Sequence, residues 1–467
     1  MSSSFPARAP LSSGSGPLEA RSGSGALQAR RLVSHVLALA AVTSVVVTSV
    51  FAAGRDTRGP DAAALPEAET EPVPRVPATP AWLLPAQAQL DLTASASAAS
   101  PLETSAAGPP EASPATPPGA PPAFNPQLTL PLWVRTTQDT TLWSASDPAL
   151  GVALGSLPSS GYLKPLGQFT DGRLQVYFPG DGVRPSARAW VDVQTLEPSA
   201  PPTWVAPGVG GGPTAPPRRL AEIAPPSVTA AHVAIVDDAS GQLLYGEDPD
   251  ARVPQASTTK IATTIVALER AADLQQKIKV TVSASAMAAA DGSSTMGLEP
   301  GEQVKLETLL YGMMLPSGND AAEQVARSLA GSRAAFVDWM NQEVESLGLK
   351  NTHFVNPSGM DASGHYSSAY DMAILGRYAM RNPTFRALAA ATHYASDGYP
   401  MKNLNRLLGV YPGADGIKIG ETDNAGKTIV ASAVHDGHRV YVSLMHSADL
   451  AGDCTALFDW VWSAFSW

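Results

Sequence analysis

Two strand pairs, one at each end of residues 227–467, constrain the fold of this chain more than any other feature. Residues 428–434 and 439–445 are apolar runs joined by a turn that contains Asp-Gly, which predicts a β-hairpin. Residues 232–237 and 242–245, joined by Asp-Ala-Ser-Gly, predict a second hairpin at the beginning of the same region. Because helical periodicity fills the interval, we expect an α+β domain in which the first and last strands share one antiparallel sheet covered by helices.

The interval between the strand pairs carries the start signals of several helices. Ser368 stands at an N-cap position, and Asp371 follows three residues later as its capping-box partner. Another helix begins near Ser257, where an apolar periodic run starts. The expected helices cover residues 255–268, 306–314, 320–329, 334–347 and 369–380.

The N-terminal residues predict a tail and a membrane segment. Residues 1–31 are rich in Ser, Gly and Ala, carry four arginines against one glutamate, and are typical of a disordered cytoplasmic tail. Residues 32–54 contain no charge and are long enough to cross a bilayer as a helix, with the tail inside and the rest of the chain outside. Small residues near Gly54 also resemble a signal peptidase site, so the segment is either a retained anchor, which its length favours, or a cleaved signal.

Two linkers flank a small β-rich segment. Residues 55–127 alternate Pro, Ala, Ser, Thr and Glu, and residues 200–226 are rich in Pro and Gly, so both predict extended connections. Between them, residues 128–199 show short apolar runs separated by Asp-Gly turns, which predicts a small all-β barrel. By its strand spacing and its Trp-Val-Asp ending, the segment resembles the SH3-like modules of bacterial cell-wall enzymes. The sequence does not identify a ligand for this module. We expect its aromatic residues to form the barrel core: Trp133, Trp143, Tyr162, Tyr177 and Trp190.

Charge, cysteine and histidine usage exclude several classes of function. The net charge is −11, and the sequence contains no cluster of Lys and Arg that would follow a phosphate backbone, so we expect no nucleic-acid partner. The one cysteine, Cys454, rules out an intramolecular disulfide and has apolar neighbours typical of a buried residue. The eight histidines lack ligand spacing, so neither a metal site nor a cofactor is expected.

Ser257 and Lys260 form the first candidate for catalysis. On a helix, residues three apart lie on one face, so the serine hydroxyl and the lysine amine would be neighbours. A lysine whose pKa is lowered by burial or nearby cations can take the proton of a serine nucleophile. The alternative is an N-cap serine followed by a solvated lysine, and the pair alone does not decide between these interpretations.

Two further motifs strengthen the catalytic interpretation. Ser317-Gly-Asn319 lies between two expected helices, and Lys418-Ile-Gly420 opens the region of the terminal hairpin. With Ser257-x-x-Lys260, the three motifs have the order and spacing of the penicillin-interacting serine enzymes.

On these motifs, residues 227–467 resemble the serine-type D-alanyl-D-alanine carboxypeptidases, the low-molecular-mass penicillin-binding proteins of the S11-like peptidases. Segments 254–260, 351–361, 364–368 and 415–418 are also similar to the usual sequence of that family. The resemblance implies a β-lactamase/DD-peptidase-like fold, action on peptidoglycan stem peptides in the bacterial cell envelope, and inhibition by β-lactams.

The resemblance also implies a role for each motif residue. Ser257 would form an acyl-enzyme with the D-Ala-D-Ala peptide, and Lys260 would be its base. Ser317 would relay a proton to the leaving amine, while Asn319 would hold the substrate backbone. Lys418 would attract the substrate's carboxylate. Gly420 would lie beside the extended substrate, where the N–H of Ser257 and a backbone N–H of the strand after Lys418 would form the oxyanion hole.

The third motif departs from the family pattern. Ile419 stands where threonine usually binds the substrate carboxylate, and Glu421 stands where tyrosine is common. Thr422 is a candidate for the missing hydroxyl. Loss of one such hydrogen bond would cost about 1 to 3 kcal/mol, which weakens turnover without abolishing it.

Three functions therefore stay open at the level of sequence. The first is a carboxypeptidase, with endopeptidase action as a variant. The second is a catalytically weak or inactive homologue that binds the cell wall. The third is a class A β-lactamase, which needs a Glu-x-x-x-Asn element that we do not find between Ser317 and Lys418.

Overall fold

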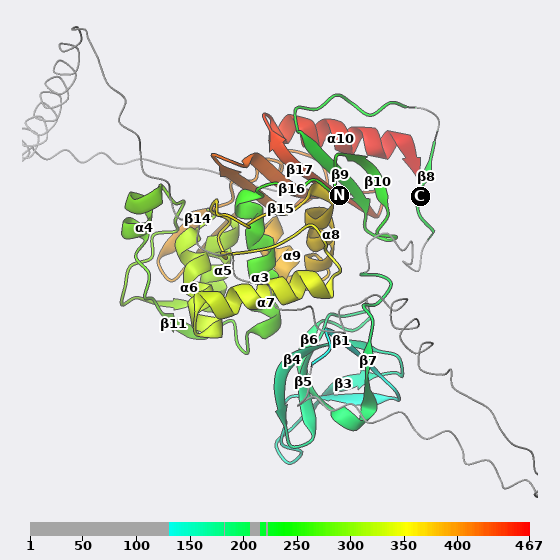
Figure 1. Ribbon diagram of the computed structural model, residues 1–467, viewed down its shortest axis with the longest axis vertical. Helices are drawn as coiled ribbons and strands as arrows, with labels where there is room; N and C mark the ends of the chain where they lie inside the picture. Colours follow the sequence, from blue (N-terminus) through cyan, green and yellow to red (C-terminus); the bar gives the residue numbers. More distant parts are fainter. Residues whose placement is uncertain (1–129, 182, 206–214, 221–222) are drawn as a thin grey trace, which may run out of the picture. The chain divides into compact units, whose positions relative to one another are not determined.

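The computed structural model describes residues 130–467 except 182, 206–214 and 221–222 (Figure 1). The expected tail at 1–31, membrane segment at 32–54 and linker at 55–127 lie outside the described residues. In the described part of the chain, no helix is both long and apolar enough to span a membrane.

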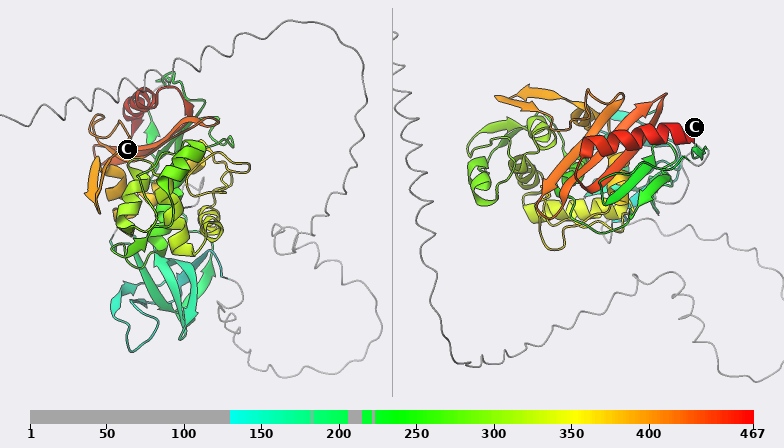
Figure 2. Two further views of the ribbon diagram at one scale, coloured as in Figure 1. Left: turned by 90° about the vertical axis from the view of Figure 1, so that its left-hand side faces the viewer. Right: turned by 90° about the horizontal axis from the view of Figure 1, so that it is seen from above.

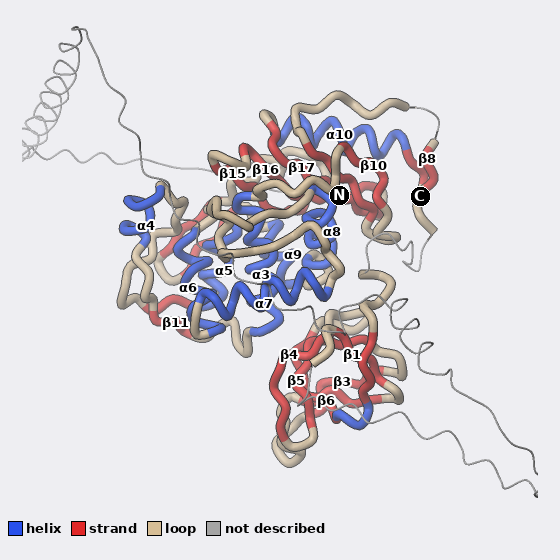
Figure 3. Tube along the Cα trace, in the orientation of Figure 1, coloured by secondary structure: helices blue, strands red, loops and turns tan. Residues whose placement is uncertain are grey.

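The segment that follows the first linker is a seven-stranded antiparallel sheet with the order β3-β2-β6-β5-β4-β1-β7 (Figure 3). Aliphatic side chains such as Val134, Leu163 and Val176 form its core. The expected aromatic core is wrong, since none of the five aromatic residues belongs to that cluster. Trp133 and Tyr162 pack instead against the core of the larger domain, because they lie where the two domains meet. The strands are β1 (Trp133–Thr136), β2 (Thr140–Trp143), β3 (Ala153–Leu157), β4 (Tyr162–Thr170), β5 (Arg173–Phe178), β6 (Ala187–Asp192) and β7 (Leu196–Ser199).

The larger domain is built on a five-stranded antiparallel sheet with the order β10-β9-β17-β16-β15. The first hairpin of the domain therefore pairs with the last strand, as predicted, and β15 is left as an edge strand. The strands are β9 (His232–Asp237), β10 (Leu243–Glu247), β15 (Ala414–Thr422), β16 (Gly426–His435) and β17 (His438–Ser447).

Helices cover both faces of this sheet (Figures 1 and 2). Side chains that alternate along one strand enter different cores: Val236 packs with the helices that carry the site, and Ile235 packs with α10. The expected α+β architecture is confirmed. The helices are α3 (Lys260–Arg270), α4 (Ala284–Asp291), α5 (Leu306–Met314), α6 (Asn319–Ala330), α7 (Arg333–Ser346), α8 (Ala369–Ala379), α9 (Pro383–Ala390) and α10 (Leu450–Ala464).

Two local predictions differ from the structure in detail. Ser368 caps α8 by accepting a hydrogen bond from the Asp371 N–H, but the Asp371 carboxylate accepts from the Asn351 N–H instead of completing a capping box. The expected second linker contains a short strand, β8 (Arg218–Arg219), which pairs with β18 (Phe465–Ser466). The remaining short strands are β11 (Lys277–Lys279), β12 (Gln303–Lys305), β13 (His393–Ser396) and β14 (Tyr399–Lys402).

A buried ionic cluster joins the seven-stranded sheet to the end of α3. Lys164 of β4 forms ion pairs with Glu269, at 2.8 Å, and with Glu343 of α7. Tyr378 of α8 donates a hydrogen bond to Glu269 at 2.6 Å. Since α3 begins at Lys260, this cluster supports the far end of the helix that carries the candidate site.

Candidate active site

Ser257 lies in a single 3₁₀ turn, Ala256–Thr259, that leads directly into α3. Two glycines let other backbone segments approach this turn. A Cβ on Gly359, where φ is +92°, would lie 1.9 Å from the Ala256 carbonyl oxygen. A Cβ on Gly420 of β15 would lie 2.6 Å from the Ser257 nitrogen. The glycine of the third motif therefore brings the edge strand against the backbone of the candidate nucleophile.

The Lys260 amine is the centre of the site. It is completely buried and lies 2.8 Å from the Ser257 Oγ, 2.6 Å from the Asn319 Oδ1 and 2.6 Å from the Ser358 carbonyl oxygen. Burial holds the pKa of Lys260 well below its usual value, and the positive charge of Lys418 lowers it further. A neutral amine can donate to the two fixed oxygens, which leaves its lone pair to accept the Ser257 proton.

The turn before α6 brings the second motif to this amine. Ser317 adopts a positive φ of 65°, an unfavourable conformation for a residue with a side chain, at the junction between α5 and α6. The Asn319 amide is held in place because its Nδ2 donates to the Ser293 Oγ at 3.0 Å. The arrangement leaves the Ser317 side chain in the lining of a pocket that also contains Ser257.

Lys418 on β15 is a second buried cation. It is 2% exposed, and its Nζ donates to the Ile419 carbonyl oxygen at 2.8 Å. Burial lowers its pKa from the usual value to about 7. Its charge therefore affects the neighbouring Lys260 and can respond to pH near neutrality.

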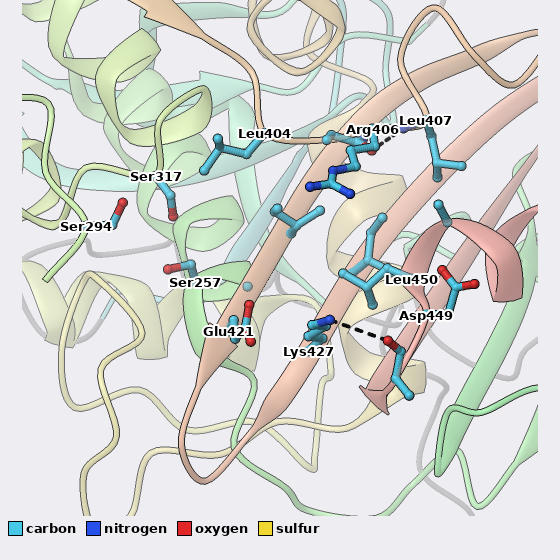
Figure 4. A pocket seen from close by; sticks show the side chains of 16 residues that line it. Ser257, Ser294, Ser317, Leu404, Arg406, Leu407, Glu421, Lys427, Asp449 and Leu450 are labelled. Carbon is cyan, nitrogen blue, oxygen red and sulfur yellow. Dashed lines mark hydrogen bonds between the residues drawn. The ribbon is translucent and has the colours of Figure 1, made fainter. Parts of the chain in front are cut away.

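The pocket next to the serines has a volume of about 470 Å³ (Figure 4). One end contains Ser257 and Ser317, while the other end is largely apolar and extends to the beginning of α10. Ile419, Gly420 and Glu421 of β15 form part of its wall.

The expectation for Thr422 needs correction. Its hydroxyl donates to the Asp361 Oδ1 at 2.8 Å and accepts from the Ala425 N–H at 3.2 Å, which closes the β15–β16 turn. Thr422 is not among the residues that line the pocket. The hydroxyl is therefore engaged in the turn and does not replace the one that Ile419 lacks.

The sequence did not reveal the buried residues that contact Lys260 and the turn of Ser257. The Ser358 carbonyl, the third partner of Lys260, lies in segment 351–361, whose functional contribution was not predicted. His365 lies within 3.0 Å of the Thr259 Oγ1 through its Nε2, and burial lowers its pKa to about 4. Because the Nδ1 accepts from the Val355 N–H at 3.0 Å, this neutral imidazole fixes the turn that carries Ser257.

Comparisons with known proteins agree with this geometry. Residues 220–448 match the family described as Peptidase_S11, D-alanyl-D-alanine carboxypeptidase. The D-alanyl-D-alanine carboxypeptidase DacB2 of Mycobacterium tuberculosis is 35% identical over 238 residues, which cover 48% of this chain and 80% of that protein. DacF of Bacillus subtilis is 36% identical over 46% of this chain and 56% of its own length, and DacA of Escherichia coli is 38% identical over 49% and 58%.

Among solved structures, the Streptomyces K15 DD-transpeptidase is 30% identical and has a TM-score of 0.49, with coverage of 52% of this chain and 100% of that one. The chain spans little more than half the length of the Bacillus and Escherichia relatives. With the match to residues 220–448, the antiparallel sheet between helices and the Ser–Lys pair at the start of α3 are those of a DD-peptidase domain. The chain belongs to the Peptidase_S11 family of D-alanyl-D-alanine carboxypeptidases.

Proposed function

We propose that this protein is a serine DD-carboxypeptidase that removes the terminal D-alanine from peptidoglycan stem peptides through a Ser257 acyl-enzyme. One observation carries the proposal: the completely buried Lys260 amine lies 2.8 Å from the Ser257 Oγ, and burial and Lys418 lower its pKa. A neutral amine at hydrogen-bond distance is a general base for a serine nucleophile.

In the acylation step, Lys260 takes the hydroxyl proton while the Ser257 Oγ attacks the carbonyl carbon of the penultimate D-alanine. The carbonyl oxygen becomes an oxyanion, which the Ser257 N–H and a backbone N–H of β15 stabilise. Gly420 supports this assignment because it allows β15 to approach the Ser257 nitrogen so closely. The Asn319 amide, held by Ser293, contributes to the position of the Lys260 amine and of the substrate backbone.

The tetrahedral intermediate collapses when the C–N bond to the terminal D-alanine breaks. Lys260 returns its proton to the leaving amine, with the Ser317 hydroxyl as the relay, and an ester between Ser257 and the stem peptide is left. Water then loses a proton to Lys260, attacks the ester carbonyl, and releases the shortened peptide as Ser257 regains its proton.

The release of D-alanine from a pentapeptide stem tests this proposal. We expect the wild type to release D-alanine, Ser257→Ala to release none above background, and Ile419→Thr to work faster than the wild type, since it restores a hydroxyl beside Lys418. Release by Ser257→Ala at the wild-type rate would contradict the mechanism.

A second candidate, a weak or inactive homologue that binds the cell wall, is favoured by the aliphatic Ile419 in the wall of the pocket. It predicts that the wild type binds muropeptides without turnover and that Ser257→Ala binds them equally well. A β-lactamase function instead requires fast release of hydrolysed penicillin, so a long-lived penicillin adduct argues against it.

We also infer that the catalytic domain works outside the cytoplasm at the cell envelope. The uncharged residues 32–54 support a membrane anchor or, if cleaved, secretion, and residues 55–127 support an extended spacer. The seven antiparallel strands within residues 128–199 are compatible with an SH3-like module. The partners that follow are peptidoglycan stem peptides, β-lactams as inhibitors, and the membrane.

A further inference from the structure

The loop between β14 and β15 forms a wall of the pocket beside Ser317. Two adjacent residues anchor its beginning: the Leu404 N–H donates to the Leu315 carbonyl oxygen at 3.2 Å, and the Asn403 side chain donates to the Ala391 carbonyl oxygen at 2.9 Å. Leu315 lies two residues before Ser317. Its bond to Leu404 therefore holds the next two loop residues, Asn405 and Arg406, close to the serine end of the pocket.

Asn405 is a buried residue in the lining of this pocket. The residue is 5% exposed, and its Oδ1 accepts from the Leu407 N–H at 3.1 Å. Its Nδ2 has no hydrogen-bond partner in the described part of the chain, although the residue lines the pocket. The Nδ2 is itself buried, and the bond between the Asn405 Oδ1 and the Leu407 N–H fixes the loop on both sides of Arg406.

Arg406 places a positive charge next to Asn405 in the lining of the pocket. Its exposed guanidinium forms neither an ion pair nor a hydrogen bond with residues 130–467 as far as they are described. Figure 4 shows its side chain extending from the loop over the pocket toward the side where Ser317 and Ser257 lie. Guanidinium groups recognise carboxylates through paired N–H donors.

The other charged groups of the pocket already have partners or face each other. Lys427 lies directly opposite Glu421 in the β15–β16 register, and its Nζ approaches the Ala448 carbonyl oxygen at 3.5 Å. Asp449 caps α10 by accepting from the Gly452 N–H at 3.1 Å. Among the cations that line this pocket in the described part of the chain, Arg406 is therefore the one without a partner.

We propose that Arg406 binds the C-terminal carboxylate of the residue that leaves during the reaction. Its guanidinium supplies hydrogen-bond donors that Ile419 lacks, and both residues line the same pocket. The inference rests on the proposed function, because it identifies how that site holds its substrate. Arg406 is then a specificity residue that selects peptides with a free terminal carboxylate.

The test compares two pentapeptides that end in D-Ala-D-Ala, one with a free carboxylate and one with a terminal carboxamide. We expect Arg406→Leu to raise the KM for the acid about 10- to 100-fold, since it removes a charge-assisted contact, and to leave the KM for the amide unchanged. Arg406→Lys keeps part of the preference. Ile419→Thr added to Arg406→Leu restores part of the lost affinity.

Lys427→Leu is the matched control, because it removes the other cation of the pocket and should leave the preference for the acid intact. An equal effect of Arg406→Leu on acid and amide, or no effect on either, overturns the proposal. Binding of both peptides to Ser257→Ala proteins, with and without Arg406→Leu, tests the same contact in the absence of turnover. A wild type that binds the acid through Arg406 yet releases no D-alanine would refute only the proposed function.

Discussion

The buried cluster around Lys164 predicts that the protein loses stability as the pH rises through neutrality. Two carboxylates share one lysine there, and burial together with the charge of Glu269 raises the pKa of Glu343 to about 7. A glutamate in an unfolded chain has a pKa of about 4.3. Between these two pKa values, Glu343 is protonated in the folded state and ionised in the unfolded state. Its contribution to the free energy of unfolding is therefore fully present below about pH 4 and is lost as the pH rises through about 7.

The size of the effect follows from the two pKa values. A difference of nearly three units corresponds to on the order of 3 to 4 kcal/mol in the free energy of unfolding, at about 1.36 kcal/mol for each unit. Glu343→Gln keeps the shape of the side chain but cannot titrate, while Lys164 retains Glu269 as its partner. The variant should therefore show a flatter dependence of stability on pH.

Denaturant unfolding at several values between about pH 5 and about pH 8 measures this difference. Glu345→Gln is the control, because Glu345 lies on the same helix and is exposed. We expect the wild type and the control to lose stability relative to Glu343→Gln over this range. Parallel curves for all three proteins would refute the assignment of the proton to Glu343.

Three further predictions concern the site. Gly420→Ala should slow acylation by a labelled penicillin at least about tenfold, because the new Cβ would lie 2.6 Å from the Ser257 nitrogen; an unchanged rate would contradict the close approach. Thr422→Val should change kcat/KM less than about threefold, since the Thr422 hydroxyl bonds to Asp361; a larger loss would indicate that Thr422 binds the substrate. Finally, kcat/KM should fall as the pH rises above about 7, where Lys418 loses the charge that attracts the substrate; a Lys418→Arg variant that keeps activity should lack this fall.

Much of the peptidase domain could be predicted from the sequence because its signals are local. The terminal hairpins alternate apolar and turn residues, and the Ser257–Lys260 pair needs only the geometry of one helical turn. The approach of Asn319 to Lys260 required the resemblance to a known family, since 59 positions separate the two residues.

Other parts of the site could not be predicted because they depend on the backbone or on tertiary contacts. The Ser358 carbonyl has no sequence signal of its own, and Gly359 indicates only that some backbone comes close. Trp133 was expected in the core of its own sheet, but it packs against the neighbouring domain. An apolar residue gives the same sequence pattern in both cases. The position of Arg406 in the lining of the pocket likewise becomes visible only when the folded pocket is known.

The central claim is that Ser257 is the nucleophile and the buried Lys260 amine is its base. Incubation with a labelled penicillin, followed by peptide mass mapping and measurement of the acylation rate, tests it directly in the wild type and in Lys260→Met. We predict an adduct on Ser257 in the wild type and a rate about 10²- to 10⁴-fold lower in the variant. An adduct at another residue, or equal rates in the two proteins, would contradict the account.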